Sequence, residues 1–222
     1  MKLDERRPQL LEVTEKGMDK PETVKLYDNI FSKAHFYYHR VAKRALGIKK
    51  DPKVIADVGT GPGFLAIELA KMSNAKVIAT DISPNMIKTA EENAKKSGAN
   101  IEFKISDANK LPFDDDSIDL LTASFLIHFL KDMTPLLNEL KRVMKPGGRV
   151  MLTTFRRDVF FLTKEAVYLI DIFIRNKPIH KMGAVIESSF TRQEIKTILD
   201  QEGLNSYHIF SGLARMDIII GF

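Results

Sequence analysis

From residue 53 onward, short apolar runs typical of buried strands alternate with segments whose apolar residues recur at helical spacing. The runs predicted to be strands are Lys53–Val58, Lys76–Thr80, Ile101–Ile105, Ile118–Ser124 and Arg149–Thr154. The helical segments between them are Gly63–Met72, Pro84–Ser97 and Met133–Val143. This alternation predicts βαβ units, and therefore an α/β fold in which helices cover both faces of a mostly parallel sheet.

Helical patterns also flank this core. Residues 23–46 carry apolar groups at helical spacing, and Gly47 follows as a stop. Residues 156–180 form an apolar-rich stretch that predicts one long helix above the carboxyl end of the sheet. We expect a single domain over residues 1–222. Its parts are an N-terminal helical cap (1–50), a core (51–155), a helical lid insertion (156–190) and a C-terminal helix and hairpin (191–222).

The C-terminal part has its own markers. Thr191 and Glu194 have the spacing of a capping box, which predicts a helix that runs to about Gln201. Tyr207–Phe210 and Met216–Gly221 read as two strands, and an antiparallel pair can close an otherwise parallel sheet.

Composition narrows the class of protein. The 222 residues are 44% hydrophobic and 28% charged, as in a globular chain, and none is cysteine. Cysteine chemistry of every kind is therefore excluded. No apolar run reaches the roughly 18 residues of a membrane span, and the charged start does not resemble a secretory signal, so we expect a cytoplasmic protein. The net charge of +5 permits an anionic substrate, RNA or an acidic membrane surface, but also fits ordinary solvated lysines.

The central feature is the segment from Asp57 to Gly63, which reads Asp-Val-Gly-Thr-Gly-Pro-Gly. A buried strand ends here and a helix follows at once. Glycine allows a sharp turn and the close approach of a ligand, and a helix N-terminus favours an anion. The turn therefore predicts a polar or anionic ligand at the carboxyl end of the sheet.

Three observations narrow the identity of that ligand. Phe64 stands where the dinucleotide fingerprint needs a third glycine. Asp81 lies 20 residues after Gly61, at the end of the second strand, where a carboxylate can accept both hydroxyls of a ribose. Asp107 ends the next strand and can accept from an adenine amine, while Ala108 leaves room for the ring. An adenosine linked to a small charged group, without a diphosphate, fits S-adenosylmethionine (SAM), whose methionine carboxylate would lie over Gly59–Gly63 and whose ammonium would face Asp57.

With these motifs the chain resembles the class I SAM-dependent methyltransferases over about residues 53–155. Beside the glycine turn, the matching segments are Thr80–Met86, Asp107–Ser117 and Lys145–Arg149. The resemblance implies a Rossmann-like sheet of seven strands in the order 3-2-1-4-5-7-6, with strand 7 antiparallel. It also implies that Thr60, Asp81, Asp107, Ala108 and Ser124 contact the cofactor. Together with the reading of the turn, the expected cofactor contacts are Asp57, Gly59, Thr60, Gly61, Gly63, Asp81, Ile82, Met86, Asp107, Ala108 and Ser124. Ile82 and Met86 would flank the adenine.

Within the superfamily, the chain is most similar to the ubiquinone/menaquinone-biosynthesis type and its small-molecule relatives. Tyr27 and Asp28, followed by an aromatic helix, resemble the N-terminal cap of that group. After the fourth strand, residues 124–127 read Ser-Phe-Leu-Ile in place of the tetrapeptide typical of adenine and glutamine N-methyltransferases.

Several side chains are candidates for the acceptor side. His128 follows the fourth strand and could act as a general base, although it could equally pack inside a helix. Tyr27, Phe31 and Tyr38 could line an acceptor pocket, or could pack the cap helix. His35 and His39 have the i, i+4 spacing of metal ligands, but the sequence offers no third ligand, so we expect no metal site.

These observations lead to one prediction and two alternatives. We expect a methyltransferase that acts on a small apolar or aromatic acceptor by in-line displacement and releases S-adenosylhomocysteine (SAH). An RNA or protein methyltransferase that uses the basic N-terminal arm is one alternative, and a SAM-binding protein without activity is the other. Whether carbon, oxygen or nitrogen accepts the methyl group stays open, as does the oligomeric state, with a homodimer among the options.

Overall fold

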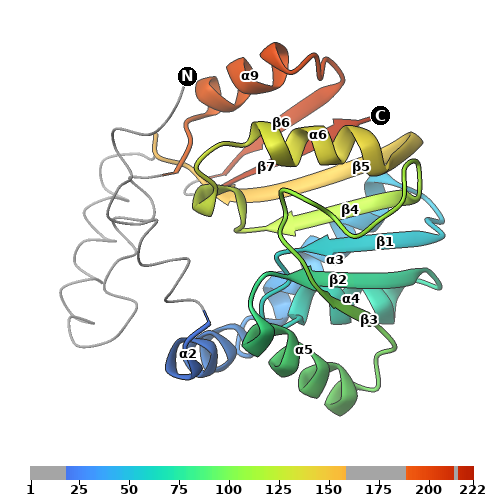
Figure 1. The fold of residues 1–222 in the computed structure, drawn as a ribbon, viewed down its shortest axis with the longest axis vertical. Helices are drawn as coiled ribbons and strands as arrows, with labels where there is room; N and C mark the ends of the chain where they lie inside the picture. Colours follow the sequence, from blue (N-terminus) through green and yellow to red (C-terminus); the bar gives the residue numbers. More distant parts are fainter. Residues whose placement is uncertain (1–18, 159–188, 213–214) are drawn as a thin grey trace.

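The fold is described from a computed structural model, which covers residues 19–158, 189–212 and 215–222. Its centre is a seven-stranded sheet with the order β3-β2-β1-β4-β5-β7-β6 (Figure 1). The strand order and the Rossmann-like class predicted from the sequence are therefore confirmed. The predicted lid falls almost entirely on residues 159–188, outside the described residues.

The strands lie close to their predicted positions. Their bounds are Val54–Val58 (β1), Lys76–Asp81 (β2), Glu102–Ile105 (β3), Ile118–Ser124 (β4), Met144–Phe155 (β5), Tyr207–Ser211 (β6) and Arg215–Gly221 (β7). The first five strands pair in parallel, and β7 pairs antiparallel with both β5 and β6. The carboxyl ends of β1 to β5 therefore share one edge of the sheet with the start of β7.

Helices cover both faces of the sheet (Figure 1). The described helices are Pro21–Phe31 (α2), His35–Ile48 (α3), Phe64–Met72 (α4), Pro84–Ser97 (α5), Thr134–Val143 (α6) and Arg192–Gln201 (α9), with a 3-10 turn at Ile127–Phe129 (η2). In Figure 1, α6 and α9 lie on one face and α3, α4 and α5 on the other. None of the helices in the described ranges is long and apolar enough to cross a membrane.

Two apolar cores follow from the period-2 alternation of the strands. In β1, Ala56 packs in the core beneath α6 and α9, whereas Ile55 packs in the core beneath α3 and α4. In β4, Leu121 packs in the first of these cores and Leu120 in the second. Both faces of the central strands are thus buried, as expected for a parallel sheet.

The helix predicted over residues 23–46 is in fact two helices, α2 and α3, so that prediction was wrong in detail. The chain turns at Ser32–Ala34, where Lys33 and Ala34 donate to carbonyls three residues back. Such tight bonds end an α-helix. The predicted stop at Gly47 was also wrong, since α3 continues to Ile48.

Other boundaries differ in informative ways. β5 begins at Met144 and includes the turn at Gly147 and Gly148, so it is longer than predicted. Around His128 the chain forms only the 3-10 turn η2, and α6 begins later, at Thr134. The capping box at Thr191 is confirmed, because its side chain accepts from the Glu194 N–H at 3.1 Å.

Candidate active site

Three glycines shape the turn between β1 and α4. Gly59, Gly61 and Gly63 have positive φ angles of 69°, 54° and 84°, a region that residues with a β-carbon avoid. A β-carbon at Gly59 would lie 2.9 Å from a methyl carbon of Leu126, and one at Gly63 would lie 2.9 Å from Ala90. At Gly61 a β-carbon would meet no atom within 4 Å. Gly59 and Gly63 are therefore needed for packing, whereas Gly61 borders open space.

Three N–H groups of the turn already donate within the protein. The Thr60 N–H donates to the Thr80 carbonyl at 2.9 Å, and the Gly63 N–H to the Thr60 carbonyl at 3.0 Å. The Gly61 N–H donates to the Asp81 carboxylate at 2.8 Å. The first turn of α4 has no side-chain cap, so the positive end of the helix stays available to an anion.

Asp57 lies beneath the turn and is 2% exposed. Its carboxylate accepts from the Thr60 hydroxyl at 2.7 Å and from the Thr122 hydroxyl at 2.6 Å. Burial raises the pKa of Asp57 to about 6, against these two hydrogen bonds. A buried carboxylate held by neutral hydroxyls favours a nearby cation, which fits the predicted contact with an ammonium group; that contact stays a prediction.

Asp81 ends β2 beside the turn. One carboxylate oxygen accepts from the Gly61 N–H at 2.8 Å, and the other accepts from the Ser83 N–H at 3.0 Å. Burial raises the pKa of Asp81, while these backbone bonds oppose the rise. Each oxygen still has capacity to accept a further bond. The carboxylate is thus fixed in place and can accept two hydroxyls.

The residues predicted to surround an adenine differ in exposure. Ile82 is 63% exposed, whereas Met86 and Ala108 are buried. Asp107 is exposed, and its side chain accepts from the Asn109 N–H at 2.8 Å. Apolar Ile82 therefore offers a surface to a ring, whereas Met86 is a buried residue of α5.

The N-terminal part is hydrogen-bonded to this region. Asp19 accepts from the Ser83 hydroxyl at 2.6 Å and from the Asn85 N–H at 3.1 Å. Asn93 in α5 donates to Asp28 of α2 at 2.7 Å and to the Pro62 carbonyl at 3.1 Å. These bonds hold α2 against α5, next to the glycine turn; the sequence pattern had not indicated them.

The residue after β4 is the most unusual in the site. Phe125 has a φ of 56°, a conformation that costs energy for a bulky side chain and is often found at functional sites. Its N–H donates to the Thr153 carbonyl at 2.7 Å, and its ring stacks on Phe155 at 4.5 Å. Next to it, Leu126 closes against Gly59. The loop after β4 therefore joins the glycine turn to an aromatic surface.

His128 lies three residues further on and is 4% exposed. Its Nδ1 atom is 3.4 Å from the Thr154 hydroxyl, and its ring is 4.1 Å from that of Phe129 and 5.5 Å from that of Phe155. Ser124, at the end of β4, is half-buried. His128 is thus a buried histidine at the carboxyl edge of the sheet, where the glycine turn also lies. Its catalytic role stays a prediction.

A continuous chain of aromatic rings runs from the cap to this loop. Tyr27 contacts Phe31 at 5.3 Å, and Phe31 contacts Tyr38 at 6.3 Å. Tyr38 contacts Tyr37 at 5.2 Å, and Tyr37 stacks on Phe125 at 5.9 Å. In this row of rings, the residues predicted to line the acceptor pocket, Tyr27, Phe31 and Tyr38, lie on the side away from β4. Tyr37 is the cap residue that contacts the loop after β4.

The two histidines of α3 share a carboxylate. His39 lies 3.0 Å from Glu68 of α4, and His35 lies 3.6 Å from the same side chain. These contacts join the two exposed histidines of α3 to a buried glutamate of α4. Over the described residues, no group of three or more histidine, aspartate or glutamate side chains has the arrangement of a metal site.

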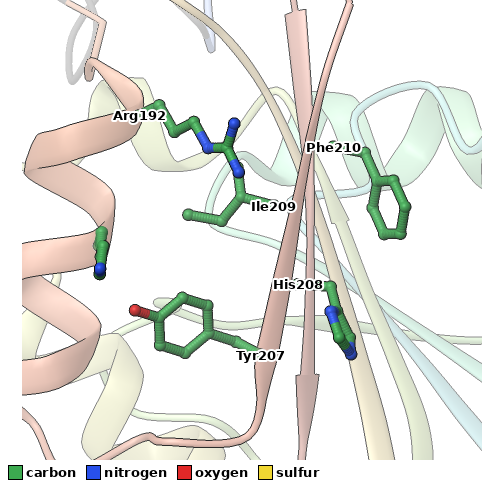
Figure 2. Close-up of a pocket in the computed structure, with 6 residues that line it drawn as sticks. Arg192, Tyr207, His208, Ile209 and Phe210 are labelled. Atoms are coloured by element: carbon green, nitrogen blue, oxygen red, sulfur yellow. The ribbon is translucent and has the colours of Figure 1, made fainter.

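A shallow pocket of about 390 Å³ lies elsewhere, between α9 and β6 (Figure 2). Tyr207 and Ile209 point toward α9, from which Arg192 extends toward Ile209; His208 and Phe210 point the other way. In the sheet order β6 stands four positions from β1, which is about 19 Å at the usual strand spacing. This pocket is therefore separate from the glycine turn.

Comparison with known proteins agrees with the geometry. A methyltransferase-domain family matches residues 49–204. A ubiquinone/menaquinone biosynthesis C-methyltransferase from Idiomarina loihiensis is 30% identical over 204 residues, 86% of this chain and 79% of that protein. A demethylmenaquinone methyltransferase from Chlorobaculum tepidum is 40% identical, but the match spans 48% of this chain and 42% of the other, less than half of each.

A solved structure from Methanococcus maripaludis, assigned as an S-adenosyl-L-methionine-dependent methyltransferase, aligns with a TM-score of 0.70 at 27% identity. The alignment covers 89% of this chain and 91% of that one. The family match covers most of the sheet and the whole glycine turn, and the strand order is the one that the motifs implied. The chain therefore belongs to the class I SAM-dependent methyltransferases, close to the ubiquinone/menaquinone-biosynthesis type, and is an enzyme that uses SAM.

Proposed function

We propose that the chain transfers a methyl group from SAM to a ring carbon of a small, electron-rich aromatic acceptor such as a quinol. The single observation that carries the proposal is the aromatic surface formed by Phe125, Phe155 and Tyr37. It lies directly beside the loop that closes against Gly59, and therefore next to the expected position of the cofactor. The names of the quinone-modifying relatives agree with this acceptor class.

The residues present fit the cofactor. Asp81 is fixed by two backbone N–H groups and can accept the ribose hydroxyls. The open space at Gly61 leaves room for the methionine part, and the uncapped end of α4 can hold its carboxylate. Asp57 would gain a cationic partner in the methionine ammonium. Exposed Ile82 offers an apolar surface to the adenine.

When bound, SAM would supply an electrophilic methyl group with a neutral thioether as leaving group. The acceptor carbon would gain the methyl group as the carbon–sulfur bond breaks and would then lose a proton. What the chain contributes is alignment. Phe125 and Tyr37 would hold the acceptor ring in line and exclude water. We propose His128 as the group that helps to remove the proton, acting from the same edge of the sheet.

Transfer of a labelled methyl group tests the proposal. Purified full-length chain with labelled SAM should methylate a reduced naphthoquinol and leave the oxidised naphthoquinone unlabelled, because only the quinol ring carbon is nucleophilic. Failure to label the quinol while SAH binds would contradict this acceptor class. Label found in RNA or protein from a cell extract would favour the alternative acceptors, and a total absence of label in all fractions would favour a non-catalytic SAM-binding protein.

A further inference from the structure

Two arginines lie beside a single buried carboxylate at the start of β7. Asp217 is 3% exposed. Its carboxylate accepts from Arg44 of α3 at 2.8 Å and from the Thr153 hydroxyl at 3.1 Å. A second arginine, Arg215, lies 3.7 Å from the same carboxylate. Since Arg44 already forms a direct ion pair with Asp217, the charge of Arg215 is a local excess.

Arg215 differs from the neighbouring arginines in its partners. Arg156 forms a 2.9 Å ion pair with Asp158, and Arg157 forms a short one with Glu194. The 3.7 Å contact of Arg215 exceeds hydrogen-bond distance, and its side chain is 35% exposed. The guanidinium therefore retains N–H donors that can bind an anion.

The position of Arg215 places this charge at the acceptor side. Arg215 is the first residue of β7 and pairs with Phe155, the last residue of β5, at the carboxyl edge of the sheet. Its guanidinium carbon stands 5.1 Å from the centre of the Tyr37 ring. Tyr37 in turn stacks on Phe125. The cation and the aromatic surface thus form one continuous wall.

We propose that Arg215 binds an anionic oxygen of the acceptor, a phenolate or carboxylate attached to an aromatic ring that lies against Tyr37 and Phe125. This assignment rests on the proposed methyl transfer and names the acceptor more closely. A guanidinium offers paired N–H donors that match such an oxygen. A phenolate oxygen, unlike a carboxylate, would also make the ring carbons more nucleophilic, so for a phenolate the same contact would select acceptors that are ready to react.

Binding of two matched probes to SAH-saturated protein tests the assignment. The probes are 2-naphthoate, which is anionic at pH 7, and its neutral isostere 2-naphthamide, both followed by fluorescence. We expect wild type to prefer 2-naphthoate by about tenfold or more, as a charge-assisted contact allows. Arg215→Gln should abolish that preference and leave 2-naphthamide binding within about twofold. Arg215→Lys should retain part of it.

Arg192→Gln is the matched control, because it removes the same charge from the separate pocket in Figure 2. It should leave both affinities unchanged. The assignment would be overturned if wild type showed no preference for 2-naphthoate, or if Arg215→Gln lost affinity for both probes equally. It would also be overturned if Arg192→Gln had the same effect as Arg215→Gln. SAH binding, measured by calorimetry in the same samples, separates the two claims: its absence contradicts the proposed function, whereas SAH binding without a charge preference contradicts only the role of Arg215.

Discussion

The backbone N–H of Gly61, in the turn after β1, donates to the carboxylate of Asp81, at the end of the neighbouring strand β2, at 2.8 Å. This bond links two parts of the expected cofactor site. Asp81 is the acid that we expect to bind the ribose, and the turn at Gly61 is the segment that we expect to lie against the methionine part. A cofactor that contacts both would therefore meet a site whose two halves are already held together.

Gly61→Ala should separate the fold from ligand binding. Its φ of 54° makes alanine strained by about 1–2 kcal/mol, yet the added β-carbon meets no protein atom within 4 Å. Gly98→Ala is the matched control, because Gly98 also has a positive φ and open space. Urea unfolding should show similar losses for both variants, whereas calorimetry should show weaker SAH binding only for Gly61→Ala. Equal SAH affinities would mean that the cofactor does not lie over Gly61.

Asp57 should make stability depend on pH. Burial raises its pKa to about 6 from the ordinary 3.8, so the folded chain keeps a proton that the unfolded chain releases. Stability from this group is therefore full below about pH 4 and is lost as pH rises through 6, by about 3 kcal/mol. Urea unfolding between pH 4 and 7 should show this loss in wild type and not in Asp57→Asn. Parallel curves for the two proteins would refute the burial argument.

Arg44→Met should destabilise the fold, because it removes the direct partner of buried Asp217. Breaking a buried ion pair costs about 3–5 kcal/mol. Arg44 is partly exposed, and Thr153 and Arg215 remain near the carboxylate, so we expect about 2–3 kcal/mol in the free energy of unfolding. Lys43→Met, at an exposed position of the same helix, should change it little. A loss no larger than that of Lys43→Met would show that Asp217 does not depend on Arg44.

His128→Ala should leave SAH affinity unchanged and lower turnover roughly 10²–10⁴-fold if the imidazole removes the acceptor proton. The matched control is His208→Ala, at an exposed position of β6. Kinetics with the acceptor found by methyl labelling provide the measurement, with melting curves to show that the variant is folded. Turnover close to that of wild type would leave His128 a packing residue between Phe129 and Phe155.

Much of the fold could be predicted from the sequence because its determinants are local. Strand runs, the glycine turn and the capping box at Thr191 each lie within a few residues, and the ordered motifs supplied the strand order. The break between α2 and α3 was missed because the apolar spacing continues across Ser32–Ala34, while the turn there depends on carbonyl geometry.

The acceptor side was harder to predict because it is assembled from distant segments. Arg44 and Asp217 are 173 positions apart, and only the antiparallel register of β7 brings Arg215 beside Phe155. Phe125 could have been found from its place directly after β4, at the edge where ligands bind in such sheets. Its positive φ has no marker in the sequence.

The most direct test of the cofactor site is calorimetric titration of SAH into wild type and Asp81→Ala. We expect that wild type binds SAH and that Asp81→Ala binds it more weakly by about 1–3 kcal/mol, the usual effect of leaving paired polar groups without a partner. Melting curves for both proteins would show that the variant is folded. Equal affinities would contradict the ribose assignment of Asp81, and no binding to wild type would contradict the cofactor site as a whole.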